Sequence, residues 1–482
     1  MKKLFAGVLV LVLLCLQTVS AETPISSCTN IDYSGYYNLT QNLTGLKSGA
    51  DYCIKITASD VILDGNGHSL TGLGNGNGVY VYGASNVTIK NVTVEDYVYG
   101  VYLYSSSNSN VTNVTVSGNS MYGIYLSSSN NNNITDVTAS NNGIGILVQF
   151  SSYNSIANVT ASSNGDGVYL YSSSNNSIAN VTASSNSYCG IRLYSSSYNR
   201  ITDVTASNNE DGIYLYSSSN NSITNVTASD NSYGIFLDYS DNNNIIDVTA
   251  SNNQGSGVYL ESSSNVTVAK SKIRSNNLGG TWAGIFVHNS SNITVFENTV
   301  TNNKYYGLVI YNVQNLKLQN NQIVDNCGGE AGAYLHSITG GSVTGNNISE
   351  NTGIGLAIYY SSNNIIENNT IQGNLKGGIY LYSASNNTIT NVTANNNNYE
   401  GIFLYSASNN NTITNVTANN NLEGILLSSS SNNNTIKDSV LKNNSYGIVL
   451  ESSGNNLIYN NYFNNTNNVT IYDSQPNTWN VT

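Results

Sequence analysis

The chain is poor in charged residues, proline, histidine and methionine. Of its 482 residues only 9% are charged, and there are 2 Pro, 3 His and 2 Met. Globular proteins carry about 25% charged residues, so Ser, Thr and Asn must supply the surface polarity here. The 37 Tyr, with many Ile, Val and Leu, provide enough apolar surface for a core, which argues against general disorder.

Helical periodicity is also missing, and after residue 21 no apolar run is long enough to span a bilayer. Residues 1–21 have a basic start, an apolar run and a small residue at Ala21, which predicts a signal peptide cleaved there. Loss of Lys2 and Lys3 changes the formal charge from −12 to −14. An acidic exported chain is a poor partner for nucleic acid. We expect a secreted or cell-surface protein, or a periplasmic one if the host has a periplasm.

Four cysteines remain after this cleavage. Cys28 and Cys53 lie in the non-repetitive N-terminal segment, and an oxidising compartment favours a disulfide between them. Cys189 and Cys327 lie far apart in the repeats, and the sequence leaves open whether they are buried thiols or intermolecular links.

A glycine-anchored repeat fills most of the chain. The pattern G-[IVL]-x-[LVI] recurs from Gly78 to Gly447 every 22 or 23 residues, except for the 27-residue step to Gly284 and the 25-residue step to Gly332. In residues 212–231, GIYLYSSSNNSITNVTASDN, Ile213 and Leu215 alternate with outward tyrosines, and Ile223 and Val226 begin two further short strands.

Three short strands in about 22 residues predict a parallel β-helix, whose turns stack at ~4.8 Å. We expect one all-β solenoid of about eighteen turns. Its predicted parts are the signal peptide (1–21), an N-terminal cap (22–52), the repeats (53–451) and a C-terminal cap (452–482). Caps are needed because open strand edges invite aggregation.

The sequence resembles the right-handed parallel β-helix repeat proteins of the pectate-lyase-like superfamily, in particular the exported NosD-type and archaeal surface proteins. The resemblance is carried by CTNIDYSGYYNLTQNLT and CIKITASDVILDGNGHSLTG within 28–72, by the GIYLYSSSNN repeats, and by NNLIYNNYFNNTNNV at 455–469. It is specific for fold and weak for activity, because that superfamily mixes lyases, hydrolases, epimerases, a copper-site accessory protein and structural proteins.

Two outward columns of the repeat are aromatic and predict a stripe of rings along one face. Stacked rings stabilise a sheet, and an exposed stripe also offers a surface to sugar rings or to a neighbouring protein. The residues that we expect to bind a ligand are Tyr102, Tyr104, Tyr169, Tyr171, Tyr214, Tyr216, Tyr380 and Tyr382.

A third repeated position, at the bend between the second and third strands, holds Asn or Asp, for example Asn113, Asp136 and Asn225. Stacked amides here can hydrogen bond along the axis, which explains many N-x-S/T sequons without glycosylation. The sequons that fit this column less obviously are better glycan candidates: Asn86, Asn289, Asn292, Asn347 and Asn468.

Chemistry is predicted where the repeat is irregular, on residues 234–336. The second tyrosine column changes there to Asp238, Glu261 and His288 on successive turns, followed by Tyr311 and His336. Glu261 and His288 are expected roughly 5 Å apart at the backbone, which allows an acid/base pair or a shared metal ion. The catalytic candidates are Asp238, Glu261, His288 and Arg274, and the metal candidates are Asp238, Glu261, His288 and His336.

The resemblance adds that lyases of the superfamily use acidic residues for calcium and an Arg or Lys base, so Ca²⁺ is a candidate ion although no cofactor is expected. The regularity of the repeat favours a non-enzymatic surface or envelope protein, structural or adhesive, that binds carbohydrate, contacts neighbouring envelope proteins or self-assembles. The alternatives are a polysaccharide lyase or hydrolase, and a copper-site accessory protein. Copper favours Cys, Met and His, of which the mature chain has few.

Overall fold

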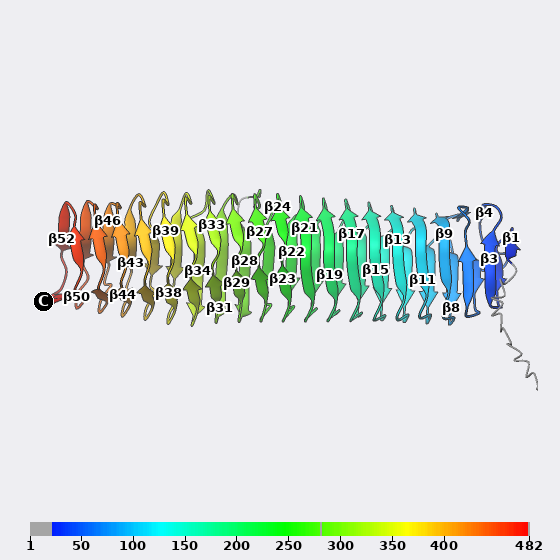
Figure 1. The fold of residues 1–482 in the computed structure, drawn as a ribbon, viewed down its shortest axis with the longest axis horizontal. Helices are drawn as coiled ribbons and strands as arrows, with labels where there is room; N and C mark the ends of the chain where they lie inside the picture. Colours follow the sequence, from blue (N-terminus) through cyan, green and yellow to red (C-terminus); the bar gives the residue numbers. More distant parts are fainter. Residues whose placement is uncertain (1–21, 280–281, 481–482) are drawn as a thin grey trace, which may run out of the picture.

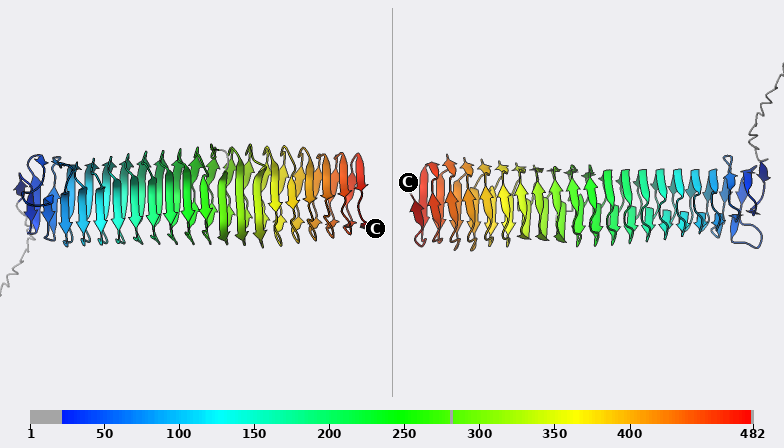
Figure 2. Two further views of the ribbon diagram at one scale, coloured as in Figure 1. Left: turned by 180° about the vertical axis from the view of Figure 1, so that it is seen from behind. Right: turned by 60° about the horizontal axis from the view of Figure 1, so that its bottom comes forward.

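The chain folds into one straight rod with its termini at opposite ends (Figure 1). This computed structural model describes residues 22–279 and 282–480, so the predicted signal peptide lies outside the described residues. Every regular element in the described part is a β-strand, and each coil stacks on the one before it (Figure 2). The predicted all-β parallel solenoid is therefore confirmed. The described residues include no helix long and apolar enough to cross a membrane.

One sheet, here called sheet B, runs along the whole rod with one strand from each coil, paired in parallel. Its strands are β2 (Thr29–Ile31), β5 (Tyr52–Ile56), β8 (Asn77–Tyr82), β10 (Tyr99–Tyr104), β12 (Tyr122–Ser127), β14 (Ile144–Gln149), β16 (Asp166–Tyr171), β18 (Cys189–Tyr194), β20 (Asp211–Tyr216), β22 (Tyr233–Asp238), β25 (Val258–Glu261), β28 (Ala283–Ser291), β31 (Tyr306–Gln314), β34 (Ala331–Thr339), β37 (Ile354–Tyr359), β40 (Ile379–Tyr382), β43 (Glu400–Tyr405), β46 (Glu423–Ser428), β49 (Tyr446–Glu451) and β52 (Asn467–Tyr472).

The rod has about 20 turns, slightly more than the eighteen expected. The difference arises at the two ends, because β2 pairs with β5 and β52 pairs with β49. Both terminal segments that we expected to act as caps thus carry strands that continue the coil.

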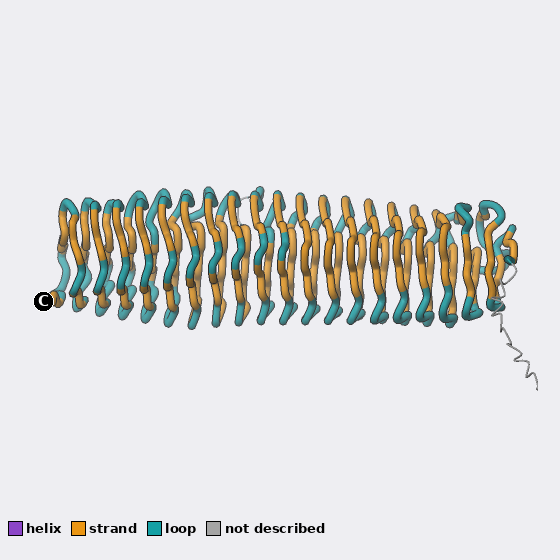
Figure 3. Tube along the Cα trace, in the orientation of Figure 1, coloured by secondary structure: helices purple, strands orange, loops and turns teal. Residues whose placement is uncertain are grey.

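The other strands of each coil form sheet A. From β9 (Thr88–Glu95) to β21 (Ser222–Ser229) the predicted second and third strands are joined in one eight-residue strand. A left-handed residue, such as Asn225 at φ 52°, bends each of these strands in the middle. From β23 (Asn244–Ile246) and β24 (Thr249–Ser251) to β50 (Leu457–Tyr459) and β51 (Tyr462–Asn464) the two are separate. Loops interrupt the strands accordingly in the C-terminal half of the rod (Figure 3).

The inward positions of both sheets form one continuous apolar core. Ile213, Leu215, Ile223 and Val226, predicted to be inward, are at most 2% exposed. The anchor glycine is required by the close stacking of turns: a Cβ on Gly212 would lie 2.5 Å from the carbonyl oxygen of the next anchor glycine. The recurrence of glycine at this position of each coil therefore has a direct steric cause.

A ladder of buried asparagines follows the last strand of each coil. Asn231 donates from its backbone N and its Nδ2 to Asn253 Oδ1 (3.0 and 3.2 Å), and from Nδ2 to the Ala206 carbonyl (3.1 Å). Its own Oδ1 accepts from Asn209 in the same way. We call this series of buried asparagines, at the bend that leads from sheet A back to sheet B, the bend ladder. It runs unbroken through Asn119, Asn142, Asn164, Asn186, Asn209, Asn231, Asn253, Asn276, Asn303, Asn326, Asn351, Asn374, Asn397, Asn421, Asn444 and Asn465.

The exposed asparagine column that the sequence predicts is a separate, outer ladder. Asn113 donates to Asn91 (2.8 Å) and Asn180 to Asn158 (2.8 Å), each along the rod axis. These residues have positive φ, a conformation that Asn adopts more readily than most residues. The outer ladder thus combines the sharp bend with an axial hydrogen bond.

A disulfide joins Cys28 to Cys53 and so links the first turn to the second. The other two cysteines are free: Cys189 is buried and Cys327 is exposed. A structural disulfide is typical of a protein that folds outside the reducing cytoplasm.

Two carboxyls flank Cys189 on sheet B, those of buried Asp166 and of half-buried Asp211. Arg192 pairs with Asp166 (3.3 Å) and its Nε donates to Cys189 Sγ (3.4 Å). On the next strand, Asp211 Oδ1 has no hydrogen-bond partner among the described residues. Burial, aided by the negative charge of Glu210, raises the pKa of Asp211 to about 7. The charged form of Asp211 is therefore unfavourable in the folded protein.

Asn231→Ala is expected to lower the free energy of unfolding by about 2–4 kcal/mol, because it leaves several buried polar groups without partners at about 1–3 kcal/mol each. Urea unfolding followed by circular dichroism measures the change. Thr227→Ala, an outward and exposed change on the same coil, is the control and should alter stability by less than about 0.5 kcal/mol. Equal effects of the two substitutions would show that the bend ladder is not what stabilises the stack.

Asp211→Asn is expected to stabilise the protein at pH 8 and to have little effect at pH 4. The pKa of Asp211 is raised in the folded protein to about 7. Below the pKa of the unfolded chain Asp211 is protonated in both states and does not affect stability. As the pH rises from there toward about 7, the unfolded chain ionises more readily and the free energy of unfolding falls. Removing the charge should restore on the order of 2 kcal/mol at pH 8, after allowance for partial exposure. Thermal unfolding at both pH values tests this, with the exposed Asp230→Asn as control. A stabilisation independent of pH would contradict the assignment.

Candidate functional site

Sheet B presents three outward columns of side chains along the rod. In β20 these are Asp211, Tyr214 and Tyr216, and the equivalent residues of successive strands lie in register. We call them the first, second and third columns. The first column is the residue before the anchor glycine, and the other two are the aromatic columns that the sequence predicts.

The rings of these columns stack from turn to turn. In the second column Tyr102 stacks on Tyr80 and Tyr125, with ring centroids 5.1 and 4.6 Å apart. In the third column Tyr194 stacks between Tyr171 and Tyr216 at 5.4 and 5.0 Å. Ring stacking of this kind stabilises neighbouring strands.

The two aromatic columns differ in exposure. Second-column rings are half-buried between their neighbours, whereas Tyr82, Tyr104 and Tyr194 of the third column are 48%, 37% and 37% exposed. Burial raises the pKa of Tyr169 and of Tyr214 to about 12. These phenols therefore remain neutral hydroxyl groups, able to donate and accept hydrogen bonds, throughout the physiological pH range.

The predicted ligand residues form three groups along the rod. Tyr102 and Tyr104 lie on β10, Tyr169, Tyr171, Tyr214 and Tyr216 on β16 and β20, and Tyr380 and Tyr382 on β40. Other rings continue the second column between these groups, as Phe236 and Tyr259 do after Tyr214. Non-aromatic residues interrupt this column at Leu147, Arg192, Val309 and Ala357.

Carboxylates are interspersed among the rings. Asp166, Asp211, Glu400 and Glu423 lie in the first column and Asp238, Glu261 and Glu451 in the third. Over the described strands β5–β49, Lys55 and Arg192 are the only Lys or Arg in the three columns, and Arg192 already pairs with Asp166. Sheet B therefore has an aromatic face with a surplus of negative charge.

Asp238, Glu261 and His288 lie side by side on β22, β25 and β28, in the predicted register. His288 Nδ1 lies 2.9 Å from Glu261 Oε2, and the Tyr259 hydroxyl donates to the same oxygen (3.0 Å). Burial and the adjacent charge of Glu261 raise the pKa of Asp238. The side chains of Glu261 and His288 are 22% and 32% exposed, so the pair is accessible to a ligand.

The remaining candidates of that region lie elsewhere. Arg274 is on β27 (Lys272–Arg274) of sheet A, where it pairs in register with Ser251 and Thr301. His336 is separated from His288 by Tyr311, on whose ring it stacks at 4.3 Å. Within residues 22–279 and 282–480, no three His, Cys, Asp or Glu side chains come together as a set that could hold a metal ion.

The 27-residue turn brings Trp282 close to rings of sheet B. Its ring contacts Phe286 at 5.2 Å and Tyr259 at 5.6 Å. The Glu261–His288 pair is thus bordered by an aromatic cluster on the side of the first column.

First-column carboxyls were missed in the sequence, although the signal was available as D-G or E-G at the anchor glycine. Burial raises the pKa of Asp166, Glu400 and Glu423.

Four of the five glycan candidates hydrogen bond to a neighbouring coil, and Asn468 makes a local bond to a residue three positions earlier. Asn86 donates to Asp60 (2.7 Å), Asn292 to Asn265 (2.9 Å) and Asn347 to Gln322 (2.8 Å). Asn289 accepts from Asn312 (2.7 Å), and Asn468 accepts from the backbone N of Asn465 (2.9 Å). None of these partners belongs to the outer ladder of Asn91, Asn113, Asn158 and Asn180. Their glycosylation stays a prediction.

Three solved structures are similar in fold. The pre-mature bacteriophage phi29 gene product 12 has 10% identity and a TM-score of 0.53, with 94% of this chain and 69% of that chain covered. The enzymatically active domain of bacteriophage CBA120 tailspike protein 2 has 14% identity and a TM-score of 0.37, covering 52% of this chain and 43% of its own length. A double mutant of the periplasmic alginate epimerase AlgG has 15% identity and a TM-score of 0.41, with 63% of this chain and 73% of that chain covered. Likeness at this level of identity concerns the fold alone.

No curated protein matches the chain in sequence. A family model described as a right-handed β-helix region matches residues 77–209, 166–323 and 283–441. These overlapping matches run from 77 to 441 and cover more than half of the chain. The chain belongs to the right-handed β-helix family.

Proposed function

We propose that this protein is an exported, non-enzymatic β-helix of the cell surface or envelope that binds neutral glycans along sheet B. The observation that carries the proposal is the set of stacked, exposed tyrosines with carboxylates beside them. Aromatic rings stack on the apolar faces of sugar rings, and phenols and carboxylates accept hydrogen bonds from sugar hydroxyls.

The charge of sheet B supports a neutral ligand. Its columns contain seven carboxyl positions and only two basic ones, and one of these two is already paired. A polyuronate or other polyanion would be repelled at neutral pH. A neutral glycan meets no such repulsion and uses the carboxylates as acceptors.

The proposed location outside the cytoplasm is supported by two independent features. The first residues are typical of a signal peptide, and the Cys28–Cys53 disulfide fits an oxidising compartment. The same face would also suit a second copy of the chain or a neighbouring envelope protein, which makes oligomeric state a necessary measurement.

Tyr194→Ala is expected to weaken binding of a neutral glycan about three- to tenfold, since one stacked ring contributes about 0.5–1.5 kcal/mol. Tyr198→Asn is the matched control: it removes an exposed ring from the same coil, but at a bend where neighbouring coils have Asn175 and Asn220. A glycan array of neutral and acidic polysaccharides, followed by calorimetry on the hits, measures both variants.

Three outcomes would contradict this proposal. Binding restricted to acidic polysaccharides would overturn the charge argument, and equal losses in the two variants would remove the third column from it. If sedimentation shows an oligomer that Tyr194→Ala dissociates, while no glycan binds, the face joins copies of the chain.

A second candidate function is cleavage of a polysaccharide at the Glu261–His288 pair, favoured by their 2.9 Å contact within the aromatic face. A carboxylate that orients an imidazole can support general acid/base catalysis. Arg274 on the other sheet has no place in this arrangement.

Glu261→Gln separates the two functions. An enzyme that uses the pair should lose at least about a hundredfold in rate but keep its glycan affinity, whereas a binding protein has no activity to lose. Release of reducing or unsaturated ends from the bound glycan is the readout. Glu451→Gln, in the same column on β49, is the control. Absence of released ends in the wild-type protein on every glycan that it binds would eliminate the enzyme.

A further inference from the structure

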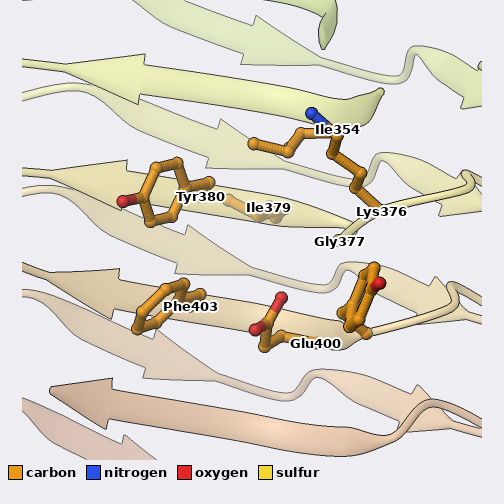
Figure 4. Close-up of a pocket in the computed structure, with 8 residues that line it drawn as sticks. Ile354, Lys376, Gly377, Ile379, Tyr380, Glu400 and Phe403 are labelled. Carbon is orange, nitrogen blue, oxygen red and sulfur yellow. The ribbon is translucent and has the colours of Figure 1, made fainter. Parts of the chain in front are cut away.

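A hollow of about 190 Å³ interrupts the first column near the C-terminal third of the rod. It is lined by Ile354, Lys376, Gly377, Ile379, Tyr380, Tyr399, Glu400 and Phe403. Figure 4 shows Ile354 and Lys376 on one side of Gly377, with Glu400 and Phe403 on the other. Engineered cavities of about 150 Å³ take up one six-membered ring such as benzene, so this hollow has the size for a single ring or a ring substituent.

Gly377 is the reason for the hollow. Each first-column position from Asn77 to Tyr446 has a side chain except this one, and its neighbours on the preceding and following coils are Ile354 and Glu400. Its φ lies outside the left-handed region, and a Cβ would meet Glu400 Oε2 at 3.1 Å. Backbone conformation therefore does not require glycine here, unlike the close turn-to-turn contact at Gly212.

The lining combines apolar walls with two opposite charges. The rings of Tyr380 and Phe403 lie 5.0 Å apart, and Ile354 closes the opposite side. Burial raises the pKa of Glu400. Among the described residues, no ion pair joins the Glu400 carboxylate to Lys376 or to another basic side chain. One acceptor and one cationic donor are thus available to a ligand.

We propose that this hollow is a subsite for the acetamido group of an N-acetylated, uncharged sugar. The amide N–H donates to the Glu400 carboxylate, the amide carbonyl accepts from Lys376 Nζ, and the methyl group packs against Ile354 and the hollow's apolar floor. The pyranose ring then lies on Tyr380 and Phe403. The neighbouring third column, Tyr359, Tyr382 and Tyr405, stacks beside it and receives the next sugars.

This inference rests on the proposed glycan binding and makes it specific. An acetamido group uses every part of the hollow, whereas a sugar with a hydroxyl at the same carbon leaves the apolar floor and one of the two charged groups unused. Glu400 is half-buried, and covering it without a hydrogen-bond donor weakens binding, so the hollow discriminates in favour of the N-acetylated sugar.

The test compares two oligosaccharides that differ only at this group, chitotetraose (N-acetylglucosamine units) and cellotetraose (glucose units), by calorimetry on the full chain. We expect wild-type protein to prefer chitotetraose about tenfold, the value of two additional hydrogen bonds with methyl burial. Gly377→Val fills the hollow and should abolish the preference, measured as the ratio of the two affinities.

Lys376→Gln tests the same subsite without risk to folding, because Lys376 is exposed, and it should reduce the preference about threefold. Leu375→Ala, an exposed change in the same bend, is the control and should have no effect. Unchanged preference in Gly377→Val would overturn the subsite and leave glycan binding by sheet B intact. Failure to bind either tetrasaccharide would overturn both. Displacement by free phenylalanine, whose charged ends also match Glu400 and Lys376, would reassign the hollow to an amino acid.

Discussion

The buried hydrogen bonds of the bend ladder are the interaction on which the rest of this rod depends. The Oδ1 of a ladder asparagine such as Asn231 accepts from the backbone N and the Nδ2 of the previous coil's asparagine. Its Nδ2 donates to a carbonyl of the previous coil and to the Oδ1 of the next coil's asparagine. A polar residue without partners in such a place would cost about 1–3 kcal/mol, so each rung is stable only when its neighbours are present. The ladder passes through the 27-residue and 25-residue turns without a break, because the extra residues are accommodated after it.

Because these bonds between coils are buried, many outward residues can vary without loss of the fold. A solenoid is stabilised by contacts between adjacent turns. Here the buried ones are the apolar core, the anchor glycines and the bend ladder, and the outer ladder and the stacked tyrosines add contacts at the surface. Few charges are needed to hold the coils together: the described residues contain four ion pairs, one of them between a histidine and a carboxylate. Outward positions can therefore change from coil to coil, and parallel register converts each change into a neighbour of the same column on the next turn.

The fold could be predicted from the sequence because aligning successive repeats shows which residues lie next to each other on neighbouring coils. Period-two alternation at Ile213 and Leu215 identified the core, and aligning the anchor glycines was enough to place Asp238, Glu261 and His288 side by side. The same alignment also separates Arg274 from that group, because Arg274 follows its anchor glycine by 17 residues, as Ser251 and Thr301 follow theirs, and this position belongs to the third strand of the repeat. The bend ladder was missed because its asparagines look like ordinary turn residues. Only the geometry shows that Asn231 is buried while Asn225, six residues earlier, is exposed.

In this solenoid the candidate functional sites lie where outward residues depart from the repeat while the bend ladder stays intact. The change from tyrosine to Glu261 and His288 keeps the strand and its core, yet creates a hydrogen-bonded pair beside an aromatic cluster. The loss of a side chain at Gly377 leaves Asn374 and Asn397 bonded as elsewhere, yet opens a hollow between two coils. In an enzyme of ordinary topology a comparable hollow requires a loop or a domain boundary. Here one glycine is sufficient, because the coils on either side are already held at a fixed spacing by bonds that lie beneath the surface.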